Sequence, residues 1–265
     1  MKKFSARNEI KPITENWNRF LNEGTWDDAV ASALGDENED TQSMGGDNML
    51  SPSSAGQAQN PLKNAGRLSS PMGDKRNRRF SHNGQDISAP VGTNVYPLAE
   101  GIVVSVRGPE EFVQKSKSAL RLASTKGVKV PDFINNDMRL VDFNHPDIQG
   151  ESSGCPKSAY RWVQEAFKVG GFNSWKEGGV WVMIKHPSLT KEGKEITAWY
   201  AHLHDLSVSE GEEVDMDTVI GTVGRSGVVC NQPHLHLEMF TGNNLEKVSG
   251  KVAGGELINP MEFIA

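Results

Sequence analysis

The hexapeptide Pro233-His234-Leu235-His236-Leu237-Glu238 decides how the rest of this sequence is interpreted. Its apolar and polar residues alternate, which is the pattern of a β-strand with one buried face. Side chains two positions apart share a face of a strand, so His234 and His236 would lie together and the two leucines would lie on the opposite face. A pair of imidazoles held in this way could form part of a metal site or an acid–base site, or be ordinary polar residues of a strand. Other residues of the chain must show which of these roles the two histidines have.

Further strand signals surround this hexapeptide. Val180–Ile184 and Ile196–Ala201 are rich in apolar and β-branched residues, and the connection Ser188–Glu195 between them predicts a hairpin. Two earlier runs, Gly92–Tyr96 and Gly101–Val106, have the same character. Short strands that follow one another without helices between them predict a mainly β fold with an antiparallel core.

Composition along the chain predicts three regions. Residues 1–34 contain apolar residues at helical spacing, and we expect a short N-terminal helix or leader there. Residues 35–74 are rich in Ser, Gly, Asn, Gln and Asp, so we expect a flexible linker and a disordered N-terminal region. The remaining residues, 75–265, are expected to form one folded domain.

An insertion of about residues 107–178 interrupts the strands of that domain. Helical patterns at 110–124 and 158–169 are separated by a segment rich in Pro, Asp and Asn. A stretch of this length is too long for a plain loop, so we expect a partly helical insertion.

Bulk properties exclude several classes of protein. The net charge of −6 gives no electrostatic reason to expect a nucleic-acid partner. Two cysteines, Cys155 and Cys230, cannot form a disulfide framework, and they are either free thiols or a single bridge. The basic start Met1–Arg7 is not followed by the apolar run of a secretory signal peptide, and no stretch approaches the roughly 18 apolar residues of a membrane helix. We expect neither secretory export nor membrane insertion.

The segment His82-Asn83-Gly84-Gln85-Asp86 could supply partners for the histidine pair. It places a nitrogen ligand and an oxygen ligand close together, with Gly84 allowing a turn between them. With one histidine of the pair it makes two imidazoles and one carboxylate, and catalytic zinc sites commonly use three such ligands and a water. Taken alone, the segment could be a turn histidine and a capping aspartate.

Trp199–Leu203 contains a further candidate. His202 falls at the end of a predicted strand, where it could act as a general base, stabilise a transition state, or simply form a structural hydrogen bond. His204, two residues later, competes for the same role.

Taken together, these segments resemble the lysostaphin/LytM-type zinc metallopeptidases, which cut peptide bonds in bacterial peptidoglycan. The resemblance covers roughly residues 80–106 and 179–240. It is carried by four segments in the family's order: His82–Thr93, Tyr200–Leu203, Val214–Gly227 and Pro233–Glu238.

The resemblance implies a fold, a cofactor and a set of roles. The fold is an antiparallel β-sheet core of barrel-sandwich hybrid type, open as a groove above a metal. Zn²⁺ would be bound by His82, Asp86 and His236. His202 and His234 would lie beside the metal, where they would activate a water and stabilise the oxyanion. The implied activity is a zinc-dependent endopeptidase acting on peptidoglycan peptides, in lysis or remodelling of the cell wall.

Two features depart from the family pattern. The loop Val228–Gln232 is not the usual Ser/Thr/Gly-rich connection, and its Cys230 is either a metal-proximal thiolate or a plain thiol. The insertion at 107–178 is longer than the family's connection, and it could line the groove or pack on the edge of the sheet.

Two other functions compete with the peptidase. A non-catalytic wall-binding or hydrolase-regulating module of the same fold would lack some ligands, whereas this chain has all of them. A phosphohistidine carrier domain would have no use for the His-x-x-x-Asp segment. An enzyme without a secretory signal must reach the wall by another route. A phage lysis protein or a virion-associated protein docked through its N-terminal segment would have such a route, and storage in the bacterial cytosol is a further alternative.

Overall fold

A computed structural model describes residues 58–63, 65–74, 82–128, 166, 168–169, 178–227, 232–241, 247–248, 251–252 and 256–264. Several expectations lie outside these residues: the N-terminal helix, the linker up to residue 57, most of the helix at 158–169, and both cysteines. The sheet and the five candidate site residues lie within them.

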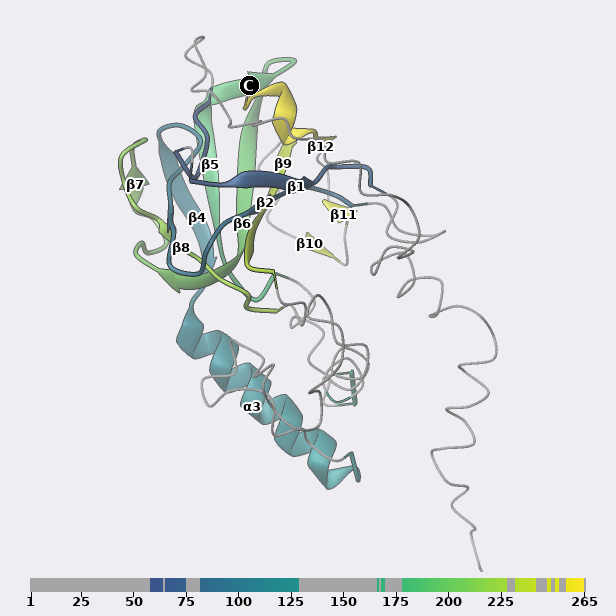
Figure 1. The fold of residues 1–265 in the computed structure, drawn as a ribbon. Coiled ribbons are helices and arrows are strands. Elements are labelled where there is room, and N and C mark those ends of the chain that lie inside the picture. The colour runs from purple at the N-terminus through teal and green to yellow at the C-terminus, as the bar shows by residue number, and fades with distance from the viewer. Residues whose placement is uncertain are drawn as a thin grey trace, which may run out of the picture.

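One antiparallel sheet dominates the structure (Figure 1). Its main path has the order β1-β2-β9-β6-β5-β4-β7. These strands are β1 Arg67–Ser70, β2 Gln85–Ser88, β4 Gly101–Arg107, β5 Val180–Lys191, β6 Lys194–Leu206, β7 Glu213–Val214 and β9 His234–Thr241. The path is open, with β1 and β7 at its two ends among the described strands. The expected mainly β, antiparallel fold is confirmed.

Shorter elements complete the described fold. Strand β8 pairs with β3 and β6, β12 pairs with β9, and β10 and β11 form a separate two-stranded sheet. The bounds are β3 Asn94–Val95, β8 Gly221–Val223, β10 Lys247–Val248, β11 Lys251–Val252, β12 Leu257–Ile258 and the 3₁₀ helix η2 Pro260–Glu262.

The hairpin β5–β6 runs through the middle of the sheet. Its turn is made by Glu192 and Gly193, whose φ angles of 53° and 75° are both positive, as a tight two-residue hairpin requires. The predicted hairpin is confirmed, and both strands are longer than the patterns indicated. Strand β6 pairs with β9 as far as Ala201 and with β8 from Leu203 onward.

The two faces of the sheet differ. Leu235 and Leu237 of β9 are fully buried, and they pack with residues such as Ile87, Tyr200 and Leu203 in the main hydrophobic core. Full burial of each such side chain stabilises the fold by about 1.5–3 kcal/mol. His234 and His236, which alternate with these leucines, project from the opposite face, as the alternation in the hexapeptide predicted.

Residues 58–74 correct the expected linker boundary. Ala58 and Leu62 are buried in the core, and β1 pairs with β2 at the edge of the sheet. The linker expected over 35–74 is therefore wrong from Ala58 onward. Composition misled here because few apolar residues stand in the stretch, yet these few pack on the core.

The described part of the insertion contains helix α3, Pro109–Thr125, which confirms the helix expected at 110–124. Pro109 begins the helix, where its missing N–H costs nothing. Phe112, Ala119 and Leu120 form its buried face. Figure 1 shows α3 extending from one end of the sheet. Among the described residues, no helix combines the length and apolar character needed to cross a membrane.

Candidate metal centre

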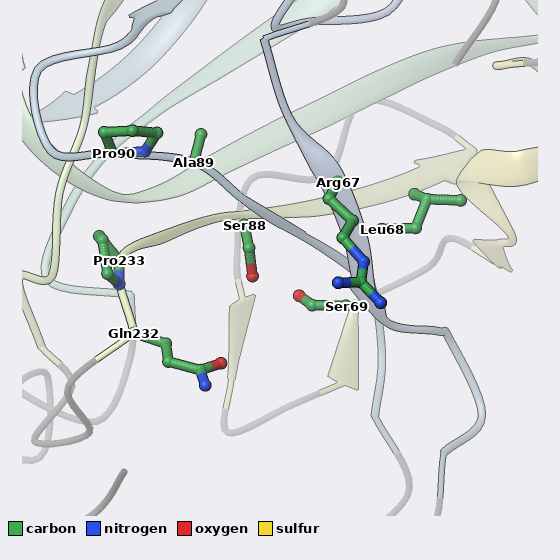
Figure 2. Close-up of a pocket in the computed structure, with 8 residues that line it drawn as sticks. All are labelled: Arg67, Leu68, Ser69, Ser88, Ala89, Pro90, Gln232 and Pro233. Atoms are coloured by element: carbon green, nitrogen blue, oxygen red, sulfur yellow. The ribbon is translucent and has the colours of Figure 1, made fainter. Parts of the chain in front are cut away.

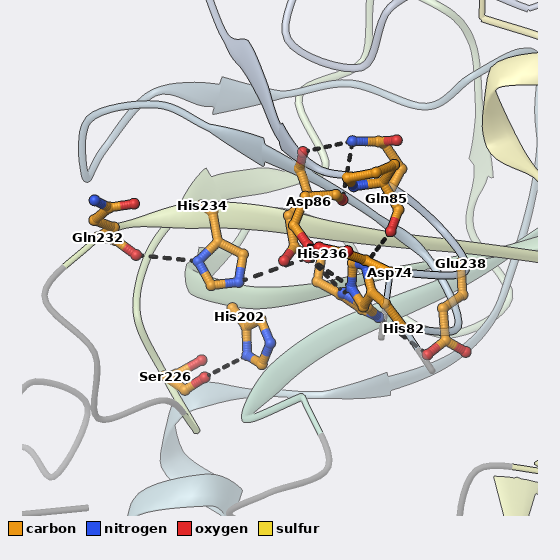
Figure 3. Close-up of polar contacts among 12 residues, drawn as sticks. Asp74, His82, Gln85, Asp86, His202, Ser226, Gln232, His234, His236 and Glu238 are labelled. Carbon is orange, nitrogen blue, oxygen red and sulfur yellow. Dashed lines mark hydrogen bonds and ion pairs between the residues drawn. The ribbon is translucent and has the colours of Figure 1, made fainter. Parts of the chain in front are cut away.

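Three potential ligands converge on the face of the sheet that carries the histidine pair (Figure 3). Asp86 on β2 is the direct cross-strand neighbour of His236 on β9, and His82 stands just before β2. Asp86 Oδ1 lies 2.7 Å from His236 Nδ1 and 3.1 Å from His82 Nε2, and these two nitrogens are 3.0 Å apart. All three side chains are largely buried.

Both histidines of this cluster have their second ring nitrogen occupied. His82 donates from Nδ1 to the Pro71 carbonyl at 3.0 Å, which leaves Nε2 facing Asp86. His236 Nε2 lies 3.0 Å from Oε1 of the buried Glu238 and donates to it, which leaves Nδ1 facing Asp86. Such outer hydrogen bonds fix the ring orientation and tautomer of metal-binding histidines.

The donor set fits a divalent metal such as zinc. Ligands about 2.0–2.2 Å from a tetrahedral ion stand about 3.3–3.6 Å from one another. The three potential ligand atoms here lie 2.7–3.1 Å from one another. Moving them apart by several tenths of an ångström would therefore make room for an ion. Two imidazole nitrogens and a carboxylate oxygen match the ligand types of catalytic zinc sites.

Electrostatics within the cluster suit a cation. Burial raises the pKa of the Asp86 carboxyl, but hydrogen bonds from His236 and His82 outweigh burial and hold this pKa well below its usual range. Burial lowers the pKa of His236, whereas its hydrogen bonds to Asp86 and Glu238 raise it and prevail. The carboxylate is therefore ionised at neutral pH, and metal binding at His236 competes with protonation of its ring.

His202 adopts an unusual backbone conformation on strand β6. Its φ of 63° lies in the left-handed region, where few residues other than glycine are found, and its N–H donates to the Gly178 carbonyl at 2.8 Å. The residue stands where β6 leaves β9 for β8. Strained backbone of this kind is often found at functional sites.

The His202 ring is held in one tautomer. Nδ1 donates to the Ser226 carbonyl at 2.9 Å, so Nε2 keeps its lone pair. Burial, with the neighbouring His234 and His236, holds the pKa of His202 well below its usual value. A neutral imidazole with a free Nε2 is the form that can accept a proton.

His234 completes the group of five residues. Its Nδ1 donates to the Gln232 carbonyl at 3.0 Å, and its Nε2 lies 3.9 Å from Asp86 Oδ1. The ring centroids of His234 and His202 are 4.9 Å apart. His204, the competitor of His202, has its Nε2 3.6 Å from Asp205 and is not part of the cluster of potential ligands.

The surroundings of the cluster leave little free space. Trp199 is 4% exposed and meets the His236 ring edge-on, with centroids 5.8 Å apart. A Cβ added at Gly178 would lie 2.3 Å from the Trp199 ring, and one added at Gly84 would lie 2.4 Å from the Leu237 carbonyl oxygen. Only glycine fits at these two positions.

All five residues predicted from the sequence are thus brought together: His82, Asp86, His202, His234 and His236. Sequence reasoning missed the hydrogen-bond acceptors behind the histidine rings. Glu238 carried a usable signal, because it stands two residues after His236 on the same predicted strand face. The Pro71 and Ser226 carbonyls carried none, since any residue has a carbonyl. Cys230 lies outside the described residues.

One family model matches part of the chain. Residues 168–249 match the model of Peptidase family M23. The match includes His202, His234 and His236, whereas His82 and Asp86 precede it. No curated protein sequence matches the chain.

Several solved structures are similar to this chain at low sequence identity. The catalytic domain of the antimicrobial peptidase lysostaphin from Staphylococcus simulans is 16% identical, with 77% of this chain and 94% of that chain covered and a TM-score of 0.40. The catalytic domain of the prophage-encoded M23 protein EnpA from Enterococcus faecalis is 17% identical, with 74% and 89% covered and a TM-score of 0.38. A zinc-containing peptidase from Vibrio cholerae is 20% identical, with 68% and 35% covered and a TM-score of 0.37.

Proposed function

Because residues 168–249 match peptidase family M23, as the resemblance in the sequence predicted, we propose that this chain is a zinc-dependent endopeptidase that hydrolyses peptide bonds in bacterial peptidoglycan. One observation carries the proposal. A His–Asp–His cluster with both outer ring nitrogens hydrogen-bonded lies beside a buried, neutral His202. A binding module without catalysis would need neither the cluster nor a neutral histidine next to it.

His82, Asp86 and His236 would hold the zinc through Nε2, Oδ1 and Nδ1. Bound there with an open fourth position, zinc would polarise the scissile carbonyl and lower the pKa of a water toward about 7. Glu238 and the Pro71 carbonyl would keep the two imidazoles aimed at the metal, because each accepts the outer N–H of one ring.

His202 would act as the general base. Its Nε2 has a free lone pair because Nδ1–H is bonded to the Ser226 carbonyl, so it can take the proton of the attacking water and later deliver it to the leaving amine. Its lowered pKa keeps it unprotonated at neutral pH.

His234 would stabilise the negative charge that develops on the carbonyl oxygen of the scissile bond. Its Nδ1–H is bonded to the Gln232 carbonyl, so its protonated form can donate from Nε2, which lies on the Asp86 side of the ring. A donor already positioned for developing charge is worth about 2.7–4 kcal/mol in other enzymes.

The expected substrate is a peptidoglycan peptide, with no role for nucleic acid or membrane insertion. The site of action would be the bacterial cell wall. A phage lysis or virion-associated protein fits this activity, and residues 1–34 could dock such an enzyme on a particle or partner. These assignments rest on the proposed activity together with the net charge of −6 and the composition of the N-terminal segment.

The proposal is tested by metal content and digestion. The purified protein should contain one zinc per chain and should release soluble peptides from purified peptidoglycan. A chelator should abolish release, and added zinc should restore it. Digestion that survives the chelator, or protein without stoichiometric zinc, would contradict the enzyme assignment.

The roles within the site are separated by two variants. His236→Ala should lose both zinc and activity, because it removes a ligand. His202→Ala should keep zinc and lose activity by a factor of about 10²–10⁴, the usual contribution of a general base. His202→Asn is the matched control for folding, since asparagine tolerates a positive φ. Zinc retained in the first variant, or normal turnover in the second, would overturn these roles.

A further inference from the structure

A pocket of about 600 Å³ adjoins the candidate metal centre at the β1 edge of the sheet. Residues of β1 and β2 line it together with the segment before β9, and its polar lining includes Arg67, Ser69, Ser88 and Gln232. Figure 2 shows the Arg67 guanidinium beside Ser69, with Ser88 and Gln232 across the pocket from it. The five site residues do not line this pocket, so it is a separate feature of the same face.

Strand register places Arg67 on the face of the metal centre. Arg67 is the cross-strand neighbour of Ser88, and Ser88 is the cross-strand neighbour of His234. Directly opposite residues of an antiparallel pair share a face, so these three side chains form one row across the sheet. The next row along β2 contains Asp86 and His236. Leu68 belongs to the other face, where it packs against the main core.

Arg67 offers a positive charge to a ligand in this pocket. Its side chain is exposed, and in the part of the chain that the structure describes it has no ion pair with a carboxylate. The whole chain carries a net charge of −6, so this cation is opposite in sign to its protein. A planar guanidinium can bind a carboxylate through two parallel hydrogen bonds.

We propose that Arg67 recognises a free carboxylate of the substrate peptide and thereby sets specificity for acidic peptides. This inference rests on the proposed peptidase function. Strands β1 and β9 lie on either side of β2, about 10 Å apart, which is the length of about three residues of extended peptide. A carboxylate about three residues from the scissile bond could therefore reach the guanidinium. Ser88 and Gln232 would offer it neutral hydrogen-bond donors from the opposite side of the pocket.

The experiment compares two forms of one substrate. Defined peptidoglycan peptides are prepared with free carboxyl groups and with the same groups converted to carboxamides. Both forms are given to the zinc-loaded wild type, to Arg67→Gln, to Arg67→Lys and to Arg121→Gln. Arg121 is the matched control, because it is an exposed arginine on α3 and its change removes the same charge.

Wild type should cleave the acid form about three- to tenfold better in kcat/KM, between the value of an exposed charge pair and that of a charge-assisted hydrogen bond. Arg67→Gln should lose this preference without losing turnover of the carboxamide form, and Arg67→Lys should keep part of it. Arg121→Gln should behave as wild type. The preference should shrink as salt is added, because screening weakens an exposed charge pair.

Failure of this inference can be told from failure of the proposed function. Active wild type with no preference for the acid form, or Arg67→Gln with an unchanged preference, would overturn the role of Arg67 alone. Zinc-loaded wild type that cleaves neither form would overturn the peptidase function. Calorimetry of the same two peptides then tests whether the pocket binds the carboxylate. Tighter binding of the acid form that is lost in Arg67→Gln supports carboxylate recognition, and equal binding of both forms overturns it.

Discussion

At the scale of single residues, one constraint on the candidate metal centre comes from a residue outside its three potential ligands. Glu238 is 4% exposed and accepts the outer N–H of His236 at 3.0 Å. A buried carboxylate in this position raises the basicity of the imidazole and holds its ring in place. The same hydrogen bond raises the pKa of His236, so the carboxylate acts on the ligand whether or not a metal is bound.

Replacing Glu238 with glutamine should weaken metal binding without removing a ligand. Glutamine keeps the size and can still accept the hydrogen bond, but it has no charge, so we expect zinc affinity to fall by about 10–100-fold. Competition with a chromophoric chelator measures the change. Glu213→Gln, the same change at an exposed position of β7, serves as the control. Equal zinc affinity in Glu238→Gln and wild type would show that the carboxylate only fills space.

The sequence predicted the five site side chains because each stood in a pattern with meaning at short range. His234 and His236 shared a face of one strand, and His82 and Asp86 stood four residues apart. It could not predict the conformation of His202, whose positive φ depends on the Gly178 carbonyl and on the change of partner of β6. Such conditions arise only when distant segments meet.

At the scale of elements, the pairing of β2 with β9 assembles the centre. The segment Gln85–Ser88 was not predicted as a strand, since only Ile87 in it is β-branched and apolar. It becomes one because β9 on one side and β1 on the other offer it backbone partners. Strands β5, β6 and β9 were predicted because their own residues favour strands, whereas β2 depends on its neighbours.

A buried hydrogen bond between His186 of β5 and Tyr200 of β6 links these two strands inside the core. His186 is fully buried, donates from Nδ1 to the Glu100 carbonyl at 3.1 Å, and has Nε2 3.1 Å from the Tyr200 hydroxyl. That hydroxyl accepts the Leu98 N–H at 2.8 Å. Burial lowers the pKa of His186 to about 4.

Stability should therefore fall in acid because of His186. In the unfolded chain His186 has a pKa of about 6.5, so below this pH it is protonated there but still neutral in the folded chain. The free energy of unfolding therefore decreases as the pH falls from about 6.5 to about 4. The full effect is about 3 kcal/mol. Urea unfolding of zinc-free wild type and His186→Gln at pH 7 and pH 4.5 measures it. The variant should lose less stability between the two pH values, and identical losses would contradict the assignment.

At the scale of the whole molecule, a bound metal would join segments that are far apart in the chain. Asp86 lies on β2 and His82 just before it, and His236 on β9 stands 150 residues after Asp86 in the chain. A metal that binds only the folded chain stabilises it by mass action. With a metal bound, the proposed centre would therefore also act as a cross-link between these segments.

Removal of the metal should lower thermal stability. With free zinc at 100 times its dissociation constant, the folded state should gain about 2.7 kcal/mol, and Tm should rise accordingly. Scanning calorimetry of chelated and zinc-loaded protein measures this gain. His236→Ala should unfold at the same temperature with and without zinc, and a zinc response as large as that of wild type would place the metal elsewhere.

The hydrogen bond from His82 to Pro71 has a consequence for where the functional unit begins. All five candidate side chains fall after residue 75, so a recombinant fragment cut at that boundary would encode every one of them. It would nonetheless lack the carbonyl that orients His82, the edge strand that supports β2, and the only charged side chain of the adjoining pocket. If the proposed function holds, the minimal active fragment is thus longer than its motifs, and it includes the stretch that precedes them.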